Sequence, residues 1–209
     1  MRHASTQQLY AYWMRQRGRR TAPLRASIEP AHISSLLGDL FILDASDLRA
    51  LTFRLAGTRF CAILGHELTG SDFLSLWRDA DYETMVATLG PVVTDAAPVV
   101  IEIGGSTERG HQLAAEMVLL PLSQDGGRRD RILGLLAPME RPHWLGLHPI
   151  TRLQILGVRR LQPEAPSLPM IAPVATPASA GHERSIADAA TPSPGRRRQH
   201  LVVLDGGRN

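Results

Sequence analysis

The sequence contains no lysine, because all 23 of its basic residues are arginine. P-loop nucleotide hydrolases, protein kinases and Schiff-base enzymes each need a lysine at a defined catalytic position. The sequence therefore excludes these enzyme classes. Asparagine is almost absent as well, with Asn209 the single example. A GC-rich genome is the simplest cause of both absences.

Cysteine and long apolar runs are also scarce. Cys61 is the only cysteine, which excludes an internal disulfide and a cysteine-rich zinc site. No stretch of 18 uninterrupted apolar residues is present, and no apolar core follows the arginines at the start. These absences predict a cytoplasmic protein in a reducing setting, without a transmembrane segment or a secretory signal.

Acidic residues are missing from the first 25 positions, which hold six arginines. The net charge of the whole chain is only +3, so the remainder carries a small negative charge. A nucleic-acid-binding domain needs a basic face on its folded body. We therefore expect no nucleic-acid partner, and keep a nucleic-acid or membrane-surface adaptor that uses the basic N-terminus as the alternative function.

Aromatic residues stop at Trp144, and the segment from Pro163 to Pro194 holds seven of the 15 prolines. Such a segment buries too little apolar surface to offset the entropy of ordering it. We divide the chain into a basic N-terminal helix in 1–27, a folded domain over 28–160 and a disordered tail over 161–209. The tail ends in a short apolar element, LVVLDGGR.

Residues 6–17 have the spacing of an amphipathic helix, with Ser5 or Thr6 as its cap and Gly18 at its end. The apolar stripe of this helix has three possible partners: a second copy in a homodimer, an anionic membrane, or the chain's own sheet. The homodimer predicts that deletion of 1–27 leaves a folded monomer. The candidate dimer-face residues are Leu9, Tyr10, Trp13 and Met14.

The run over 51–70 is the most informative part of the chain. An alternating strand over Leu51–Ala56 stops at Gly57, a short helix follows, and a turn closes the run. We expect Gly57 to have a positive φ or a close backbone neighbour, and Thr58 to cap the helix. The predicted structural turn residues are Gly57, Thr58, Gly65 and Gly70.

Further strands are predicted at 40–45, 98–104, 111–122 and 131–137, with a helix over 79–95 between the first pair of strands and the last three. Turns are expected at 108–110 and 124–127. This order predicts an α+β fold, in which an antiparallel five-stranded sheet carries helices on one side.

The order of these elements resembles the PAS domain, and most closely a single-domain subgroup of alphaproteobacterial proteins of unknown or regulatory role. The resemblance spans about Leu9 to Arg160. It implies a domain that senses a ligand, light or redox state and mediates protein contacts. The residues that carry it are FRLAGT at 53–58, GHELTG at 65–70, Trp77, Glu116 with LLPL at 119–122, and Gly134.

Departures from the family pattern limit the cofactor, which stays unknown. Flavin-binding light-sensing relatives carry an Asn-Cys motif in the helix after the second strand, whereas Cys61 lies between Phe60 and Ala62. This argues against a covalent flavin adduct. His66 and His111 have no other histidine at ligand spacing, which argues against haem and against a metal site.

The sequence shows no catalytic constellation, so we expect no enzyme and name no catalytic residue. Glu102 and Glu116 could form an acid–base pair, but solvent-facing carboxylates explain them more simply. The expected function is a sensory or regulatory interaction module that contacts a separate signalling protein. Its pocket would hold a small apolar ligand or be filled by side chains. The candidate lining residues are Phe41, Phe53, Leu55, Phe60, Met85, Leu89, Met117 and Leu119, with Trp77 as a cap or a core anchor.

Overall fold

The structure is a computed structural model, and it describes residues 1–124 and 129–163. All of these residues lie in one compact unit, Met1–Leu168. The predictions for most of the turn at 124–127 and for nearly all of the tail, including the LVVLDGGR element, lie outside the described residues.

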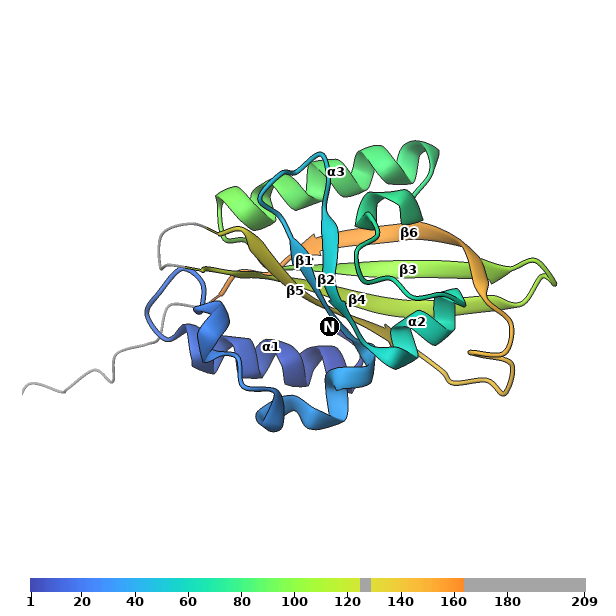
Figure 1. The fold of residues 1–209 in the computed structure, drawn as a ribbon, viewed down its shortest axis with the longest axis horizontal. Coiled ribbons are helices and arrows are strands. Elements are labelled where there is room, and N and C mark those ends of the chain that lie inside the picture. Colours follow the sequence, from blue (N-terminus) through green and yellow to red (C-terminus); the bar gives the residue numbers. More distant parts are fainter. Residues whose placement is uncertain (125–128, 164–209) are drawn as a thin grey trace, which may run out of the picture. The chain divides into compact units, whose positions relative to one another are not determined.

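One antiparallel sheet forms the centre of this unit, and its strand order is β2-β1-β5-β4-β3-β6 (Figure 1). The predicted α+β fold with an antiparallel sheet is confirmed, but the predicted count of five strands is wrong, because a sixth strand pairs with β3. The strands are β1 (Leu40–Asp44), β2 (Thr52–Ala56), β3 (Val99–Thr107), β4 (Gln112–Leu122), β5 (Arg131–Pro138) and β6 (Ile150–Arg160).

The sequence analysis missed β6 because this strand lies at the edge of the sheet and is largely exposed. Its apolar residues do not alternate cleanly with polar ones, since the pairing with β3 is interrupted between Glu102 and Ile103. Such an irregularity shifts the side-chain alternation by one residue. The turn at 108–110 between β3 and β4 is where it was predicted, and Gly110 adopts a φ of 82° there.

Helices cover both faces of the sheet (Figure 1). One face carries α1 and η2, and the opposite face carries α2 and α3. The helical elements are α1 (Ala4–Arg17), η1 (Arg25–Ser27), η2 (Pro30–Asp39), α2 (Thr58–Leu64), η3 (Phe73–Leu76) and α3 (Asp79–Thr94). None of the helices in the described residues is long and apolar enough to cross a membrane.

The α1 helix packs on the chain's own sheet. Leu9 and Trp13 are completely buried, and the Trp13 indole N–H donates to the Pro121 carbonyl of β4 at 2.8 Å. These two residues are therefore unavailable as a dimer face, which corrects that assignment. Tyr10 and Met14 are partly buried against the same core.

The caps of α1 also differ from the prediction at one end. His3, and not Ser5 or Thr6, is the N-cap residue, and its ring nitrogen accepts from the Ser5 N–H at 3.1 Å. Gly18 ends the helix as predicted, with a φ of 55°.

Candidate functional site

The space between the sheet and α2 is the position at which the sequence predicted a pocket. Four phenylalanine rings meet there, and their centroids lie 5.1 to 6.0 Å apart in edge-on, tilted and stacked pairs. These distances are those of directly contacting aromatic rings. The four are Phe41 from β1, Phe53 from β2, Phe60 from α2 and Phe73 from η3.

Phe41 lies at the centre of this aromatic cluster because β5 offers it a glycine. Phe41 and Gly134 are directly opposite each other in the β1–β5 pairing. A Cβ atom on Gly134 would lie only 2.1 Å from the Phe41 ring. The ring therefore occupies the volume above Gly134 that any other residue would fill with its own side chain.

The other predicted lining residues complete the same core, apart from Leu55. They are fully or almost fully buried in one cluster with the phenylalanines: Trp77 after η3, Met85 and Leu89 from α3, and Met117 and Leu119 from β4. Trp77 packs edge-on against Phe73 at 5.9 Å, and its indole N–H has no acceptor among the described residues.

Leu55 does not line this core, and its assignment is corrected. The β1–β2 pairing places Ile42 opposite Leu55 but Leu43 opposite Phe53, so Arg54 is an extra residue in a bulge. A one-residue bulge turns the following side chains to the other face. Leu55 accordingly shares a face with Ile42 and is 44% exposed.

The turn into α2 depends on Gly57, by close approach and not by positive φ. Its φ is −71°, but a Cβ there would lie 2.3 Å from the Leu37 carbonyl oxygen. Thr58 does not cap α2, since Gly57 is the N-cap residue and no side chain caps it, which corrects that prediction. Gly65 ends α2 with a φ of 78°, and Gly70 has a φ of 87° in the next turn.

Cys61 lies on the buried side of α2, next to the aromatic cluster. Burial raises the pKa of its thiol, and the nearby Glu67 carboxylate, 3.6 Å from Sγ, adds to the increase. A raised pKa leaves little thiolate at neutral pH. The residue is chemically a small apolar side chain in this position.

Glu116 on β4 holds the start of α1. Its carboxylate accepts from the N–H of Arg2 at 2.8 Å, the N–H of His3 at 3.1 Å and the Thr6 hydroxyl. Burial by itself raises the pKa of Glu116, but these hydrogen bonds outweigh it and the pKa is lowered. Glu102, its partner across the strands, instead forms an ion pair with the Arg2 guanidinium at 3.2 Å.

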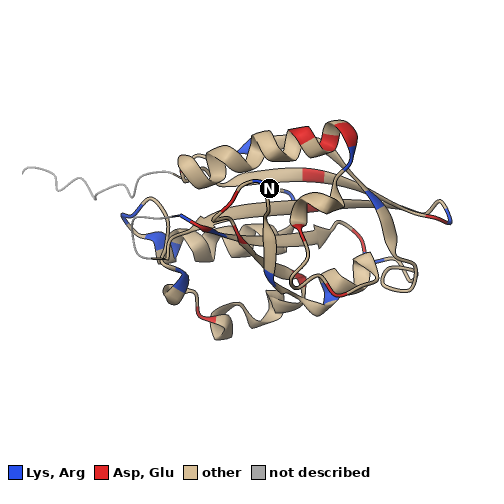
Figure 2. Cartoon of the chain, turned by 45° about the horizontal axis from the view of Figure 1, so that its top comes forward, with Lys and Arg blue, Asp and Glu red and all other residues tan. Residues whose placement is uncertain are grey.

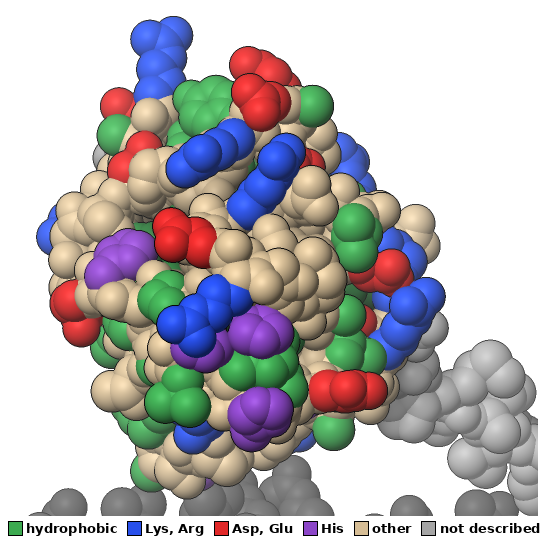
Figure 3. Space-filling model, turned by 90° about the vertical axis from the view of Figure 1, so that its right-hand side faces the viewer, with side chains coloured by type: hydrophobic (Ala, Val, Ile, Leu, Met, Phe, Trp, Pro, Cys, Tyr) green, Lys and Arg blue, Asp and Glu red, His purple; other side chains and the backbone are tan. Residues whose placement is uncertain are grey.

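The histidines gather near the β3–β4 turn (Figure 3). The His111 ring stacks on Trp144 at 4.8 Å and on His148 at 5.4 Å, and Arg109 contacts His148 at 3.3 Å. Burial and the charge of Arg109 lower the pKa of His148. Within the described residues no three His, Cys, Asp or Glu side chains are placed to hold a metal ion.

An open groove of about 590 Å³, which the sequence did not predict, lies on the part of the sheet next to β6. Its floor has small residues, Gly104 and Ala114, and its walls include Met139, Trp144 and Leu156. Leu156 is 64% exposed and Met139 is 41% exposed. Exposed apolar side chains around a concave floor are typical of a protein-binding surface.

The antiparallel sheet, the short helix after its second strand and the enclosed aromatic core define a sensory-type α+β domain. The PAS domain family profile matches residues 1–137, which include α1 as well as the strands up to β5. The chain belongs to the PAS domain family, a family of sensory and regulatory modules. No match to the chain was found among curated proteins.

Several solved structures are similar to part of the chain. The LOV protein of Rhodobacter sphaeroides is 16% identical over 50% of this chain and 60% of that one, with a TM-score of 0.41. The LOV domain of a blue-light activated histidine kinase from Erythrobacter litoralis is 16% identical over 49% of this chain and 95% of that one, with a TM-score of 0.40. The PAS domain of an HTR-like protein from Haloarcula marismortui is 22% identical over 52% and 90%, with a TM-score of 0.39.

Proposed function

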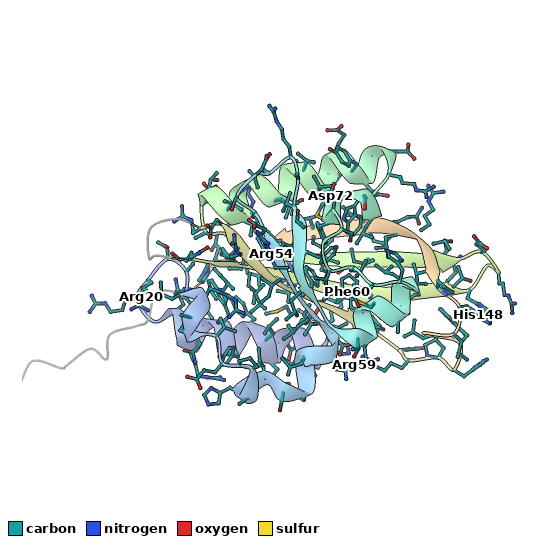
Figure 4. The ribbon with its side chains drawn as sticks, viewed as in Figure 1. Arg20, Arg54, Arg59, Phe60, Asp72 and His148 are labelled. Carbon is teal, nitrogen blue, oxygen red and sulfur yellow. The ribbon has the colours of Figure 1, made fainter. Side chains whose placement is uncertain are left out.

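We propose that this chain is a cytoplasmic PAS-type regulatory module that acts by contact with a separate protein and catalyses no reaction. The observation that carries the proposal is the aromatic cluster, in which the module's own phenylalanine rings occupy the position of a ligand. Phe60 on α2 has no exposed surface, and its ring lies 5.1 Å from that of Phe41 (Figure 4). A core filled in this way leaves the surface to carry the function.

The groove beside β6 is the surface that we assign to the partner. Its floor and walls are mainly apolar, and Glu140 is the only charged residue among those that line it. Depletion of charge at the centre of a patch is characteristic of protein interfaces. An exposed leucine such as Leu156 would then be an anchor that the partner buries.

A pair of leucine variants tests this surface. Leu156→Asp should abolish the regulated response in cells and the photo-crosslinked adduct formed from a probe in the groove. Leu147→Asp is the matched control, because Leu147 is 73% exposed but does not line the groove. Equal loss in both variants, or in neither, would contradict the assignment. An adduct that contains two copies of this chain would show that the groove is instead a homodimer interface.

A second candidate function, docking on an anionic surface such as a membrane or a nucleic acid, rests on the arginines near the end of α1 (Figure 2). Arg15, Arg19 and Arg20 are exposed, and the described residues contain no ion pair that neutralises them. Arg17 and Arg160 line one shallow pocket at this end of the unit. Binding of DNA or of anionic vesicles that weakens steeply with salt would favour this candidate.

A further inference from the structure

A pair of arginines on the outside of α2 is organised around one buried carboxylate. Asp39, at the end of η2, is almost completely buried, with a side-chain exposure of 6%. Its carboxylate accepts from Arg59 Nε at 2.9 Å and Nη2 at 2.7 Å, and from Arg141 Nη2 at 2.9 Å. Arg59 comes from α2, and Arg141 comes from the segment between β5 and β6.

The Arg59 guanidinium is held in place on several sides. Besides Asp39 it donates to the Ser35 carbonyl at 2.9 Å. It also lies against Gly38, where a Cβ atom would be 2.7 Å from its central carbon. A guanidinium fixed in this way loses little additional side-chain entropy when it binds a ligand.

The positive charge of this cluster exceeds its negative charge. Two guanidinium groups share the single Asp39 carboxylate, and the pKa of Asp39 is lowered because the hydrogen bonds and charges of both arginines outweigh the effect of burial. Arg59 Nη1, Arg141 Nε and Arg141 Nη1 have no partner among the described residues. Donors that satisfy an oxyanion therefore remain on both side chains.

A concave space of about 200 Å³ lies between these two arginines. Its walls are apolar and come from α2 and the segment after β5: Ala62, Ile63, Pro142 and Leu145. No acidic residue lines it. Drug-sized ligands and cofactors occupy roughly 300 Å³ or more, so this space fits a smaller molecule.

We propose that Arg59 and Arg141 form a binding site for a small organic anion, whose carboxylate or phosphate group meets the two guanidinium groups and whose short apolar body contacts Ile63 and Leu145. This site lies outside the aromatic core and does not depend on the partner groove. Phe60 follows Arg59 in α2, so an anion that ties α2 to the segment after β5 acts next to the aromatic cluster.

Titrations of the full chain with acetate, butyrate and inorganic phosphate, followed by the NMR signals of the arginine Nε–H groups, test this site. Butyrate should bind saturably and more tightly than acetate, by up to about fourfold for each buried methylene. Arg141→Gln should weaken butyrate binding by about tenfold or more, as expected for the loss of a charge-assisted pair. Tighter binding of phosphate than of butyrate would support the site and identify a phosphate group as its ligand.

Arg152→Gln is the matched control, because Arg152 is an exposed arginine of β6 that does not line the site. It should bind butyrate as the wild type does. Three results would overturn the proposal: no saturable shift with any probe up to about 50 mM, unchanged binding in Arg141→Gln, or equal weakening in Arg152→Gln. Thermal denaturation of each variant verifies that loss of binding is not loss of the fold.

Discussion

Replacement of Gly134 by alanine adds one methyl group at the most closely packed point of the aromatic cluster. The new Cβ atom would lie 2.1, 2.2 and 2.7 Å from three atoms of the Phe41 ring. Carbon atoms in contact prefer a separation of about 3.5–4.0 Å, so the ring has to move by more than 1 Å. Phe53, Phe60 and Phe73 surround it at centroid distances of 5.1 to 5.8 Å and oppose this movement.

Overpacking of this kind costs about 1–3 kcal/mol, and the backbone of β5 has no freedom to relax because it pairs with strands on both sides. We expect a loss of about 2–3 kcal/mol in the free energy of unfolding. For a chain of this size each kcal/mol lowers Tm by roughly 2–4 °C, so Tm should fall by about 4–12 °C.

Gly90→Ala is the control, because Gly90 lies in α3 with nothing within 4 Å of an added Cβ. It should stabilise the fold by about 0.5–1 kcal/mol through helix propensity. A double-mutant cycle with Phe41→Leu assigns the cost to the ring, because the smaller side chain should relieve part of the clash. A Gly134→Ala protein with wild-type Tm would refute the packing of Phe41 over this glycine.

Three further predictions follow from the packing and the charges of the unit. Gly57→Val should cost about 3 kcal/mol, because its Cβ meets the Leu37 carbonyl, and hydrogen exchange in 51–64 should increase with the loss in Tm; wild-type protection would contradict this. Trp13→Ala should cost about 3–5 kcal/mol, and deletion of 1–27 should give an unfolded chain instead of a folded monomer by circular dichroism. The pKa of Asp44 is lowered from 3.8 to about 2, because hydrogen bonds and nearby arginines outweigh burial, so ionised Asp44 stabilises the fold above about pH 4 and this contribution is lost as pH falls towards 2. Asp44→Asn should therefore flatten the acid limb of a plot of Tm against pH, and an unchanged limb would show that Asp44 does not contribute.

Local patterns in the sequence were sufficient for most elements of the fold. The strand, glycine and short helix over 51–65 are where the sequence predicted them, since alternation and glycine position are properties of neighbouring residues. The Arg54 bulge was not predictable, because it depends on how β2 pairs with β1. Leu55 consequently turned to the opposite face although its spacing from Phe53 was that of a regular strand.

Long-range contacts explain the other differences. The stripe of α1 was compatible with a dimer, a membrane or the sheet, and only the tertiary packing of Trp13 selects the sheet. Asp39 meets Arg59 and Arg141, which are 20 and 102 residues away in sequence, so no local motif marks this cluster. The groove beside β6 was missed together with β6 itself.

Native mass spectrometry of the full chain, purified without added ligand, tests the central claim most directly. If the phenylalanine rings fill the core and the surface carries the function, the spectrum should show the mass of the polypeptide alone, as monomer or dimer. The Phe60→Ala variant, whose truncation opens a cavity in the aromatic cluster, should acquire affinity for benzene that the wild type lacks. A stoichiometric small molecule bound to the wild-type chain and released by Phe60→Ala or Trp77→Phe would contradict the account.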